Sequence, residues 1–218
     1  MIVVGGMIGL GKTSVATLLG EALKSEVFLE SVDDNPILPL FYTASPEEIV
    51  RKRYPYLLQL HFLNSRFEAI KKALAHEHNV LDRSMHEDWY FTKVNAELGR
   101  ISGEEFAAYE SKAAGMMEEL AAIPQKGPDL MVYLKGSFET VMGRIGQRGR
   151  SFEQDRSLVD YYRVLWAGYD EWVMKHYNPA EMLVVDMDSV DVVHRPGDGE
   201  RLIGQIRDKL AGMRQLLV

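Results

Sequence analysis

Short apolar runs alternate along the chain with longer stretches whose apolar residues recur at helical spacing. The apolar runs cover residues 2–4, 27–29, 80–81, 130–134 and 182–185. The helical stretches cover about 14–25, 56–76, 85–98, 103–122, 137–147, 156–175 and 199–216. Runs that are apolar on both faces and separated by helices are typical of a parallel sheet covered on both sides. The pattern therefore predicts an α/β fold, with a five-stranded parallel sheet flanked by helices.

Proline and glycine mark the connections between these elements. Loops are predicted around Asn35-Pro36, Pro39, Ser45-Pro46, Gly127-Pro128 and Pro196-Gly197. No internal repeat, low-complexity tract or linker divides the chain. A chain of 218 residues is long enough to bury a sizeable core, so we expect residues 1–218 to form a single domain.

The composition excludes several classes of protein. The chain has no cysteine, which rules out disulfides, zinc–thiolate sites and a cysteine nucleophile. No apolar run is long enough to span a bilayer, and the first predicted strand begins at residue 2, which leaves no room for a targeting peptide. We therefore expect a cytoplasmic protein that does not bind membranes. The net charge of −7 argues against a nucleic-acid polymer as partner.

The first predicted strand leads into a glycine-rich segment, Gly6-Met7-Ile8-Gly9-Leu10-Gly11-Lys12-Thr13. This is the spacing of a phosphate-binding loop between a strand and a helix. Glycines let several backbone N–H groups point into one concavity, and the following helix directs its positive end there. Lys12 is then placed to reach the β- and γ-phosphates, and the Thr13 hydroxyl to bind Mg²⁺. A glycine-rich turn that binds nothing is the alternative, but the flanking strand and helix favour nucleotide binding.

Polar residues follow other apolar runs, at the edge where parallel sheets bind their ligands. Glu30 follows the second run and is placed to take a proton from an attacking hydroxyl, although a solvated loop acid fits its position equally well. Asp82-Arg83-Ser84 follows the third run. Asp82 is placed to hold Mg²⁺ with Thr13, and Arg83 to neutralise phosphate charge or orient the hydroxyl. Helix capping is the alternative for this segment.

Arginines gather at the end of the helical stretch 137–147 and just beyond it. Arg144 and Arg148 are four residues apart, hence on one helical face, and Arg150 follows after Gly149. Guanidinium groups suit the oxygens of a transferring phosphoryl group. A solvated basic helix end is the alternative. Phosphate binding is favoured, because an acidic chain that binds phosphates has to gather positive charge locally.

Three further polar residues are placed to form a pocket for a flat heterocycle. Gln59 and Arg66 lie seven residues apart on one face of the stretch 56–76, and Asp88 follows Asp82 by six residues. A glutamine, an arginine and an aspartate together offer donors and acceptors for the edge of a base. Individually, each is equally consistent with an ordinary surface residue or a member of an ion pair.

Taken together, these residues resemble the deoxynucleoside kinase family, in the branch of deoxycytidine, deoxyguanosine and deoxyadenosine kinases. The resemblance extends over nearly the whole chain and is closest to the bacterial purine deoxynucleoside kinases. It implies a P-loop kinase fold with an arginine-rich lid at about 144–155, ATP as donor, Mg²⁺ as cofactor and a homodimer formed through a helical bundle. The motifs that carry it are Glu30-Ser31-Val32-Asp33-Asp34-Asn35-Pro36, Leu38-Pro39-Leu40-Phe41-Tyr42, Leu81-Asp82-Arg83-Ser84 and Arg148-Gly149-Arg150.

The resemblance also implies a role for individual residues on the acceptor side. Glu30 corresponds to the base that activates the nucleoside 5′-hydroxyl, and Asp82 with Arg83 to the acid–arginine pair beside the metal and the 5′-oxygen. Tyr42 and Glu153 correspond to the residues that hold the sugar 3′-hydroxyl. The remaining assignments are Gln59, Arg66 and Asp88 for the base pocket, Arg144, Arg148 and Arg150 for the lid, residues near 188–194 for the donor adenine, and Phe62, Phe91 or Tyr90 for stacking on the nucleoside base.

The pair Arg66 and Asp88 bears on the choice of substrate, because the thymidine-accepting relatives are apolar or small at these two places. A hydrogen-bonding site rejects a base that leaves its polar groups unpaired, so thymidine is the least favoured substrate. The choice between deoxyadenosine and deoxyguanosine as substrate stays open, and deoxycytidine is a further candidate. Two other functions on the same fold also stay open: a nucleoside monophosphate kinase, and a nucleotide-binding regulatory subunit of a kinase heterodimer.

Overall fold

A five-stranded parallel sheet forms the centre of the protein, as the apolar runs predict. The computed structural model describes residues 1–30, 32, 34–76, 78–123 and 130–215. Ser31, Asp33 and the loop at Gly127-Pro128 lie outside these residues. The strand order is β2-β3-β1-β4-β5, and every neighbouring pair is parallel. The strands are β1 (Ile2–Gly6), β2 (Val27–Phe28), β3 (Val80–Asp82), β4 (Leu130–Lys135) and β5 (Glu181–Asp186).

The strand order reverses direction at β1, and this positions the site. The chain leaves β1 toward β2 and β3 on one side, then crosses to β4 and β5 on the other. A crevice opens at such a point beyond the carboxyl ends of the strands. Val4 of β1 is in register with Asp82 of β3, so the segments that follow both strands emerge next to each other.

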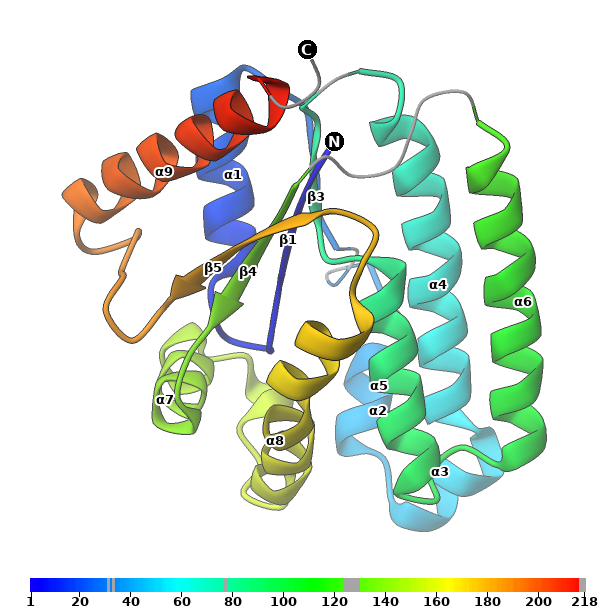
Figure 1. The fold of residues 1–218 in the computed structure, drawn as a ribbon. Coiled ribbons are helices and arrows are strands. Elements are labelled where there is room, and N and C mark those ends of the chain that lie inside the picture. The colour runs from blue at the N-terminus through cyan, green and yellow to red at the C-terminus, as the bar shows by residue number, and fades with distance from the viewer. Residues whose placement is uncertain (31, 33, 77, 124–129, 216–218) are drawn as a thin grey trace.

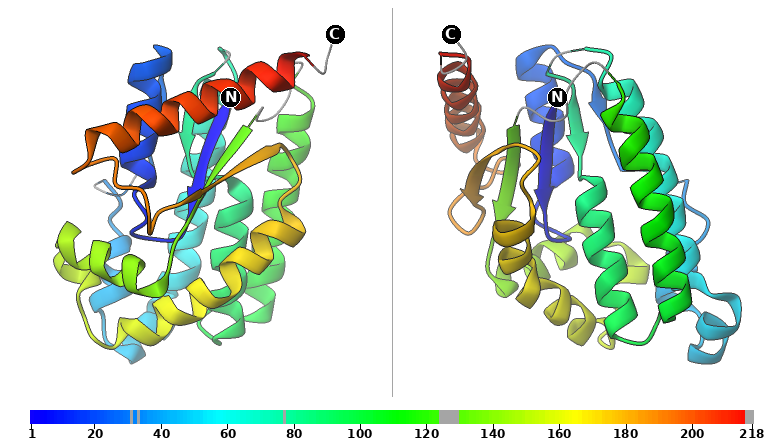
Figure 2. Two further views of the ribbon diagram at one scale, coloured as in Figure 1. Left: turned by 60° about the vertical axis from the view of Figure 1, so that its left-hand side comes forward. Right: turned by 45° about the vertical axis from the view of Figure 1, so that its right-hand side comes forward.

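Helices cover both faces of the sheet. Figures 1 and 2 show α4, α5 and α6 side by side on one side, and α1 with α9 on the other, while α2, α7 and α8 lie toward the carboxyl ends of the strands. The helices are α1 (Lys12–Leu23), α2 (Leu38–Thr43), α3 (Pro46–Lys52), α4 (Tyr54–Ala73), α5 (Met85–Glu97), α6 (Gly103–Ala121), α7 (Phe138–Arg148), α8 (Leu158–His176) and α9 (Pro196–Gln215).

Two of these helices, α2 and α3, occupy a region where prolines predicted loops. Proline lacks an N–H and has a fixed φ, which suits the first turn of a helix as well as a loop. Pro46 stands in the first turn of α3, where the Ser45 side chain accepts a hydrogen bond from Glu48 N at 3.3 Å. Pro196 likewise begins α9, three residues before the predicted start.

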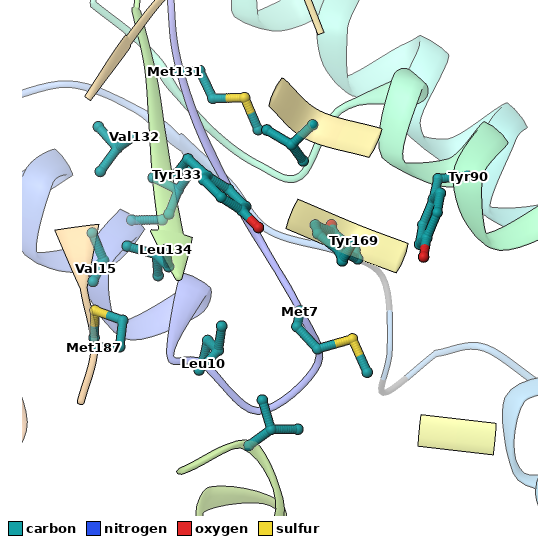
Figure 3. Packing of buried hydrophobic residues seen from close by; sticks show 14 of the residues in the cluster. Met7, Leu10, Val15, Tyr90, Met131, Val132, Tyr133, Leu134, Tyr169 and Met187 are labelled. Atoms are coloured by element: carbon teal, nitrogen blue, oxygen red, sulfur yellow. The ribbon is translucent and has the colours of Figure 1, made fainter. Parts of the chain in front are cut away.

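The buried side chains of β1 alternate between two cores. Ile2 and Val4 pack into the larger cluster, whereas Val3 joins a second cluster with Leu63 of α4. Figure 3 shows the larger cluster near the site, where the Tyr133 and Tyr169 rings stack in parallel with their centroids 6.2 Å apart. Strand alternation thus lets one short strand anchor helices on both faces of the sheet.

Packing in the second core leads to a prediction for how α4 contributes to the free energy of unfolding. Leu63 is fully buried, whereas Leu57 on the same helix is 39% exposed. Leu63→Ala should lower the free energy of unfolding by about 2–5 kcal/mol, because it leaves a cavity that the packed helices cannot fill. The matched variant Leu57→Ala should lower it by less than about 1 kcal/mol. Urea unfolding followed by circular dichroism measures both changes, and equal losses would contradict this account of the core.

Candidate active site

The segment after β1 folds as a phosphate-binding loop. Gly9 and Gly11 have φ angles of 86° and 88°, in the left-handed region that favours glycine. A Cβ on Gly9 would lie 2.9 Å from Val141 O of α7, so only glycine fits there. No described side chain caps the first turn of α1, which leaves its N–H groups directed at the loop.

Two apolar residues of this loop, Met7 and Leu10, do not line the site, whereas Ile8 does. Met7 and Leu10 are buried, and Figure 3 shows their side chains below the ring pair of Tyr133 and Tyr169. Lys12 Nζ donates to Met7 O at 3.0 Å, within the concavity. The loop is therefore anchored by apolar packing on one side and open to a ligand on the other.

A cavity of about 280 Å³ extends from this loop between the carboxyl ends of the strands and α2, α4, α5 and α8. It brings together most of the predicted site residues, which come from separate parts of the chain. Gly6, Met7, Leu10, Arg66 and Arg144 do not line it. The predicted residues that do line it are Ile8, Gly9, Gly11, Lys12, Thr13, Glu30, Tyr42, Gln59, Asp82, Arg83, Asp88, Arg148, Arg150 and Glu153.

Glu30 is held by two arginines at the middle of the cavity. Its Oε1 atom lies 2.8 Å from Arg66 Nη2 and 3.2 Å from Arg83 Nε. Burial by itself would raise the pKa of Glu30, but the positive charges of Arg83 and Arg66 outweigh it and lower the pKa to about 2. The carboxylate therefore stays ionised across the neutral pH range and offers an acceptor to a hydroxyl group.

Arg66 lies deeper than the sequence implies, behind the cavity wall. Its side chain is 3% exposed, and it donates from Nε to Asp88 Oδ2 at 3.0 Å and from Nη1 to the backbone carbonyl of Asp82. The ion pairs with Asp88 and Glu30 raise the pKa of Arg66 despite its burial. Arg66 thereby links the predicted catalytic acid Glu30 to the predicted base-pocket acid Asp88.

Thr13 and Asp82 are in contact, as a shared metal site requires. The Thr13 hydroxyl donates to Asp82 Oδ2 at 2.7 Å, while the buried Asp82 Oδ1 accepts no hydrogen bond from any described residue. An unsatisfied carboxylate oxygen beside a phosphate loop fits Mg²⁺, which binds one or two carboxylates together with substrate phosphates. Among the described residues, no group of three or more His, Cys, Asp or Glu side chains is arranged so that it could hold a metal ion.

The predicted lid arginines divide into two groups. Arg148 Nη2 and Arg150 Nη1 lie 2.5 and 3.6 Å from the Glu153 carboxylate, at the mouth of the cavity. Arg144 instead donates to the backbone carbonyls of Leu10, Met187 and Val190. Its guanidinium thus bridges the outer side of the phosphate loop to the segment after β5, and phosphate binding by Arg144 stays a prediction.

The far end of the cavity is a mixed aromatic and polar pocket. Gln59, Phe62 and Phe91 line it, whereas Tyr90 lies in the core and donates to Leu165 O. Tyr42 also lines the cavity, where its ring stacks on Phe152 with centroids 5.8 Å apart. The sequence analysis assigned no role to six further lining residues, which come from several elements: Ser14, Val32, Leu38, Phe41, Leu58 and Tyr161.

Comparisons with known proteins agree with this site. The sequence model of the family described as "Deoxynucleoside kinase" matches residues 2–211. The chain is 44% identical to a deoxyguanosine kinase of Lactobacillus acidophilus, over 99% of this chain and 93% of that protein. It is 38% identical to a deoxyadenosine kinase of the same organism, over 96% of each chain. The protein belongs to the deoxynucleoside kinase family and is an ATP-dependent phosphotransferase.

Solved structures show the same fold. The deoxyadenosine kinase from M. mycoides with bound dATP superimposes with a TM-score of 0.78 at 26% identity, covering 94% of this chain and 98% of that one. The fold is thus that of the P-loop kinases, as predicted. None of the helices in the described ranges has the length and apolar character that crossing a membrane demands.

The buried phosphate-loop lysine gives a testable pH dependence. Burial lowers the pKa of Lys12 to about 7, and the nearby charge of Arg83 contributes to this shift. Bound phosphates favour the charged amine, so at about pH 8.5 ATP binding should take up close to one proton. Isothermal titration calorimetry in two buffers of different ionisation enthalpy measures this uptake. Lys12→Met should abolish it, and an unchanged uptake in that variant would assign the proton to another group.

Proposed function

We propose that this protein transfers the γ-phosphoryl group of ATP to the 5′-hydroxyl of a purine deoxynucleoside, in nucleotide salvage. One observation carries the proposal: a single cavity joins the phosphate loop to Glu30 and, beyond it, to Gln59. A donor bound at the loop and an acceptor bound at Gln59 would meet at Glu30. The similarity over nearly the full chain to a deoxyguanosine kinase and a deoxyadenosine kinase supports a purine as the base.

Glu30 acts as the base in this proposal. Its carboxylate is ionised at neutral pH and accepts the proton of the 5′-hydroxyl as the new P–O bond forms. Arg83, whose Nε lies 3.2 Å from Glu30, is placed to bind the same 5′-oxygen or the incoming phosphoryl group. Tyr42 and Glu153 are assigned to the sugar 3′-hydroxyl, since both line the cavity near its mouth.

Positive groups around the loop stabilise the negative charge that develops during transfer. Lys12 lies within the loop, and Arg148 and Arg150 line the cavity at its mouth as the arginines of the lid. Thr13 and Asp82 are assigned to hold Mg²⁺, which would neutralise part of the negative charge of the donor phosphates. Catalysis then consists largely of positioning and electrostatic stabilisation.

The pocket around Gln59 supports selection of the base. Asp88 and Gln59 line it, and Arg66 is bonded to Asp88 from behind. Adenine and guanine both carry a ring acceptor together with an exocyclic polar group, which such a set can satisfy. We further propose that residues 1–218 act as one kinase domain, that the enzyme is a cytoplasmic homodimer, and that it works on free nucleosides rather than on nucleic acids.

The direct test offers the purified enzyme Mg²⁺-ATP with each of the four deoxynucleosides and their monophosphates, and follows ADP release. Turnover is expected with deoxyguanosine or deoxyadenosine and least with thymidine. Glu30→Gln should lower kcat by about 10²–10⁴-fold with little change in nucleoside affinity, since the carboxylate acts in the chemical step. Turnover with the monophosphates alone would contradict the proposal. The absence of turnover with every substrate would favour a regulatory subunit.

A second test concerns selection of the base. Removing the buried pair together, as Arg66→Met with Asp88→Ala, should raise the ratio of thymidine to purine kcat/KM by about 10-fold or more, because the polar groups that reject thymidine are gone. The exposed ion pair of α4 and α6 supplies the control, as Lys71→Met with Glu119→Ala. An unchanged ratio in the Arg66/Asp88 variant would refute the assigned role.

A further inference from the structure

A buried carboxylate with no role in the site as described lies directly beneath it. Glu87, in the first turn of α5, has an exposed fraction of 0%. Its Oε1 atom accepts from Gly6 N at 2.9 Å and from the Tyr169 hydroxyl of α8. Its Oε2 atom accepts from Ser84 N at 2.9 Å and from the Ser84 hydroxyl at 3.1 Å. One side chain thus ties together the start of the phosphate loop, the N-terminus of α5 and α8.

Glu87 is also in contact with Arg83, the predicted catalytic arginine. Arg83 Nη1 lies 3.9 Å from Glu87 Oε1 and 3.5 Å from the Tyr169 hydroxyl, while Arg83 Nε lies 3.2 Å from Glu30. The guanidinium is therefore held on two sides, by Glu30 facing the cavity and by Glu87 and Tyr169 beneath. The Phe91 ring packs against the guanidinium, with the ring centroid 4.5 Å from Arg83 Cζ. These contacts hold the guanidinium in place, while its buried Nε–H donates no hydrogen bond to any described residue.

The backbone at Arg83 needs such support. Arg83 has a φ angle of 75°, a left-handed conformation that is unfavourable for a residue with a side chain. Strained residues of this kind persist where their surroundings hold them, and they concentrate at functional sites. Arg83 N donates to Val4 O at 2.9 Å, and Glu87 fixes the N–H of the next residue, Ser84. Hydrogen bonds from the N–H groups of Arg83 and Ser84 thus hold the backbone on both sides of the strained Cα atom.

A second helix of the same chain shows what a capping interaction alone requires. Ser102 and Glu105 form the same reciprocal capping box at the start of α6, with Ser102 N donating to Glu105 Oε2 at 2.8 Å. That box is at the surface, where its glutamate otherwise pairs with Arg53. Capping does not call for the burial of a carboxylate, which is unfavourable unless several donors compensate it. Glu87 also contacts Gly6, Arg83 and Tyr169. These contacts are not needed for helix capping and therefore indicate a second role for Glu87.

We propose that Glu87, together with Tyr169, is a positioning residue that holds Arg83 and the first residue of the phosphate loop in a fixed relation. The acceptor-side arginine and the donor-side loop are both anchored to one carboxylate, so the 5′-oxygen and the γ-phosphate meet at a set distance. This inference rests on the proposed kinase function. It assigns no substrate contact to Glu87, which acts only through Arg83 and Gly6.

Glu87→Gln is the sharpest variant, because it keeps the shape of the side chain but turns an NH₂ group toward N–H or O–H donors. We expect kcat to fall by about 10–100-fold, with KM for ATP and for the deoxynucleoside changing by less than about threefold. Tyr169→Phe should shift the same parameters in the same direction by a smaller factor. Glu105→Gln removes the carboxylate from the matched capping box and should leave kcat unchanged. Equal effects of Glu87→Gln and Glu105→Gln would overturn the proposal.

A double-mutant cycle separates positioning from a loss of stability. If Glu87 acts through Arg83, combining Glu87→Gln with Arg83→Lys should lower kcat no further than Arg83→Lys alone. Losses in kcat that multiply would contradict the proposal, because Glu87 would then act independently of Arg83. Thermal denaturation of each variant shows how much stability is lost, and a drop in kcat that tracks melting temperature across the set would likewise count against positioning.

A measurement that does not depend on turnover keeps the two proposals distinct. The Arg83 Nε–H resonance, assigned by its absence in Arg83→Lys, should exchange slowly with water in the unmodified enzyme. In Glu87→Gln the exchange should quicken by about 10-fold or more, because the buried contacts that protect the group are weakened. Unchanged exchange would refute the positioning role. If no deoxynucleoside is phosphorylated by the unmodified enzyme, the proposed function fails, while the exchange rates still decide the role of Glu87.

Discussion

The parallel hydrogen bonding of β1 to β3 is the constraint on which the site depends. It places Val4 opposite Asp82, so that the phosphate loop and the segment Asp82-Arg83-Ser84 leave the sheet side by side. The contact between Thr13 and Asp82, which are 69 residues apart in sequence, follows from this register. A shift of one residue would turn the buried side chains of β1 to the wrong faces and separate these two segments. The register of this five-residue strand with β3 thus controls the geometry of the predicted chemistry.

Mutual compensation of buried charges is the second organising feature. Arg66 and Arg83 lie among the acids Glu30, Glu87 and Asp88, and no one of these groups would be stable there alone. Their pairing orients every member, because a buried charge that moves away from its partner loses its compensation. The result is a fixed cluster of paired side chains, of which Glu30, Arg83 and Asp88 line the cavity, and it is suited to catalysis by preorganised electrostatics. Positive groups for an anionic donor come from Lys12, Arg148 and Arg150, which also line the cavity of this chain with its net charge of −7.

The sequence revealed most of the site where function follows from local geometry. The loop from Gly6 to Thr13 is defined by glycine spacing, and the acids after the strands by their position. Other lining residues were given no role, among them Phe41 of α2, although it stands in a family motif, and Tyr161 of α8. Their recruitment depends on how helices pack over the cavity, which periodicity alone does not specify. Proline at the start of α3 was ambiguous, because the same fixed φ suits a loop and a first helical turn.

By itself, the sequence determined the five strands, the main helices, the phosphate loop and the family, because these depend on short-range spacing and on several motifs in order. Only the tertiary structure decided how the polar residues pair. Arg66, which was predicted at the base edge, connects Glu30 with Asp88, while Arg144 donates to backbone carbonyls beside the loop. Glu87 carried only a capping signal, yet it contacts Gly6 and a tyrosine of α8. Such partners lie up to 134 residues apart, and burial selects them by the need to satisfy each polar group, a condition that no local pattern encodes.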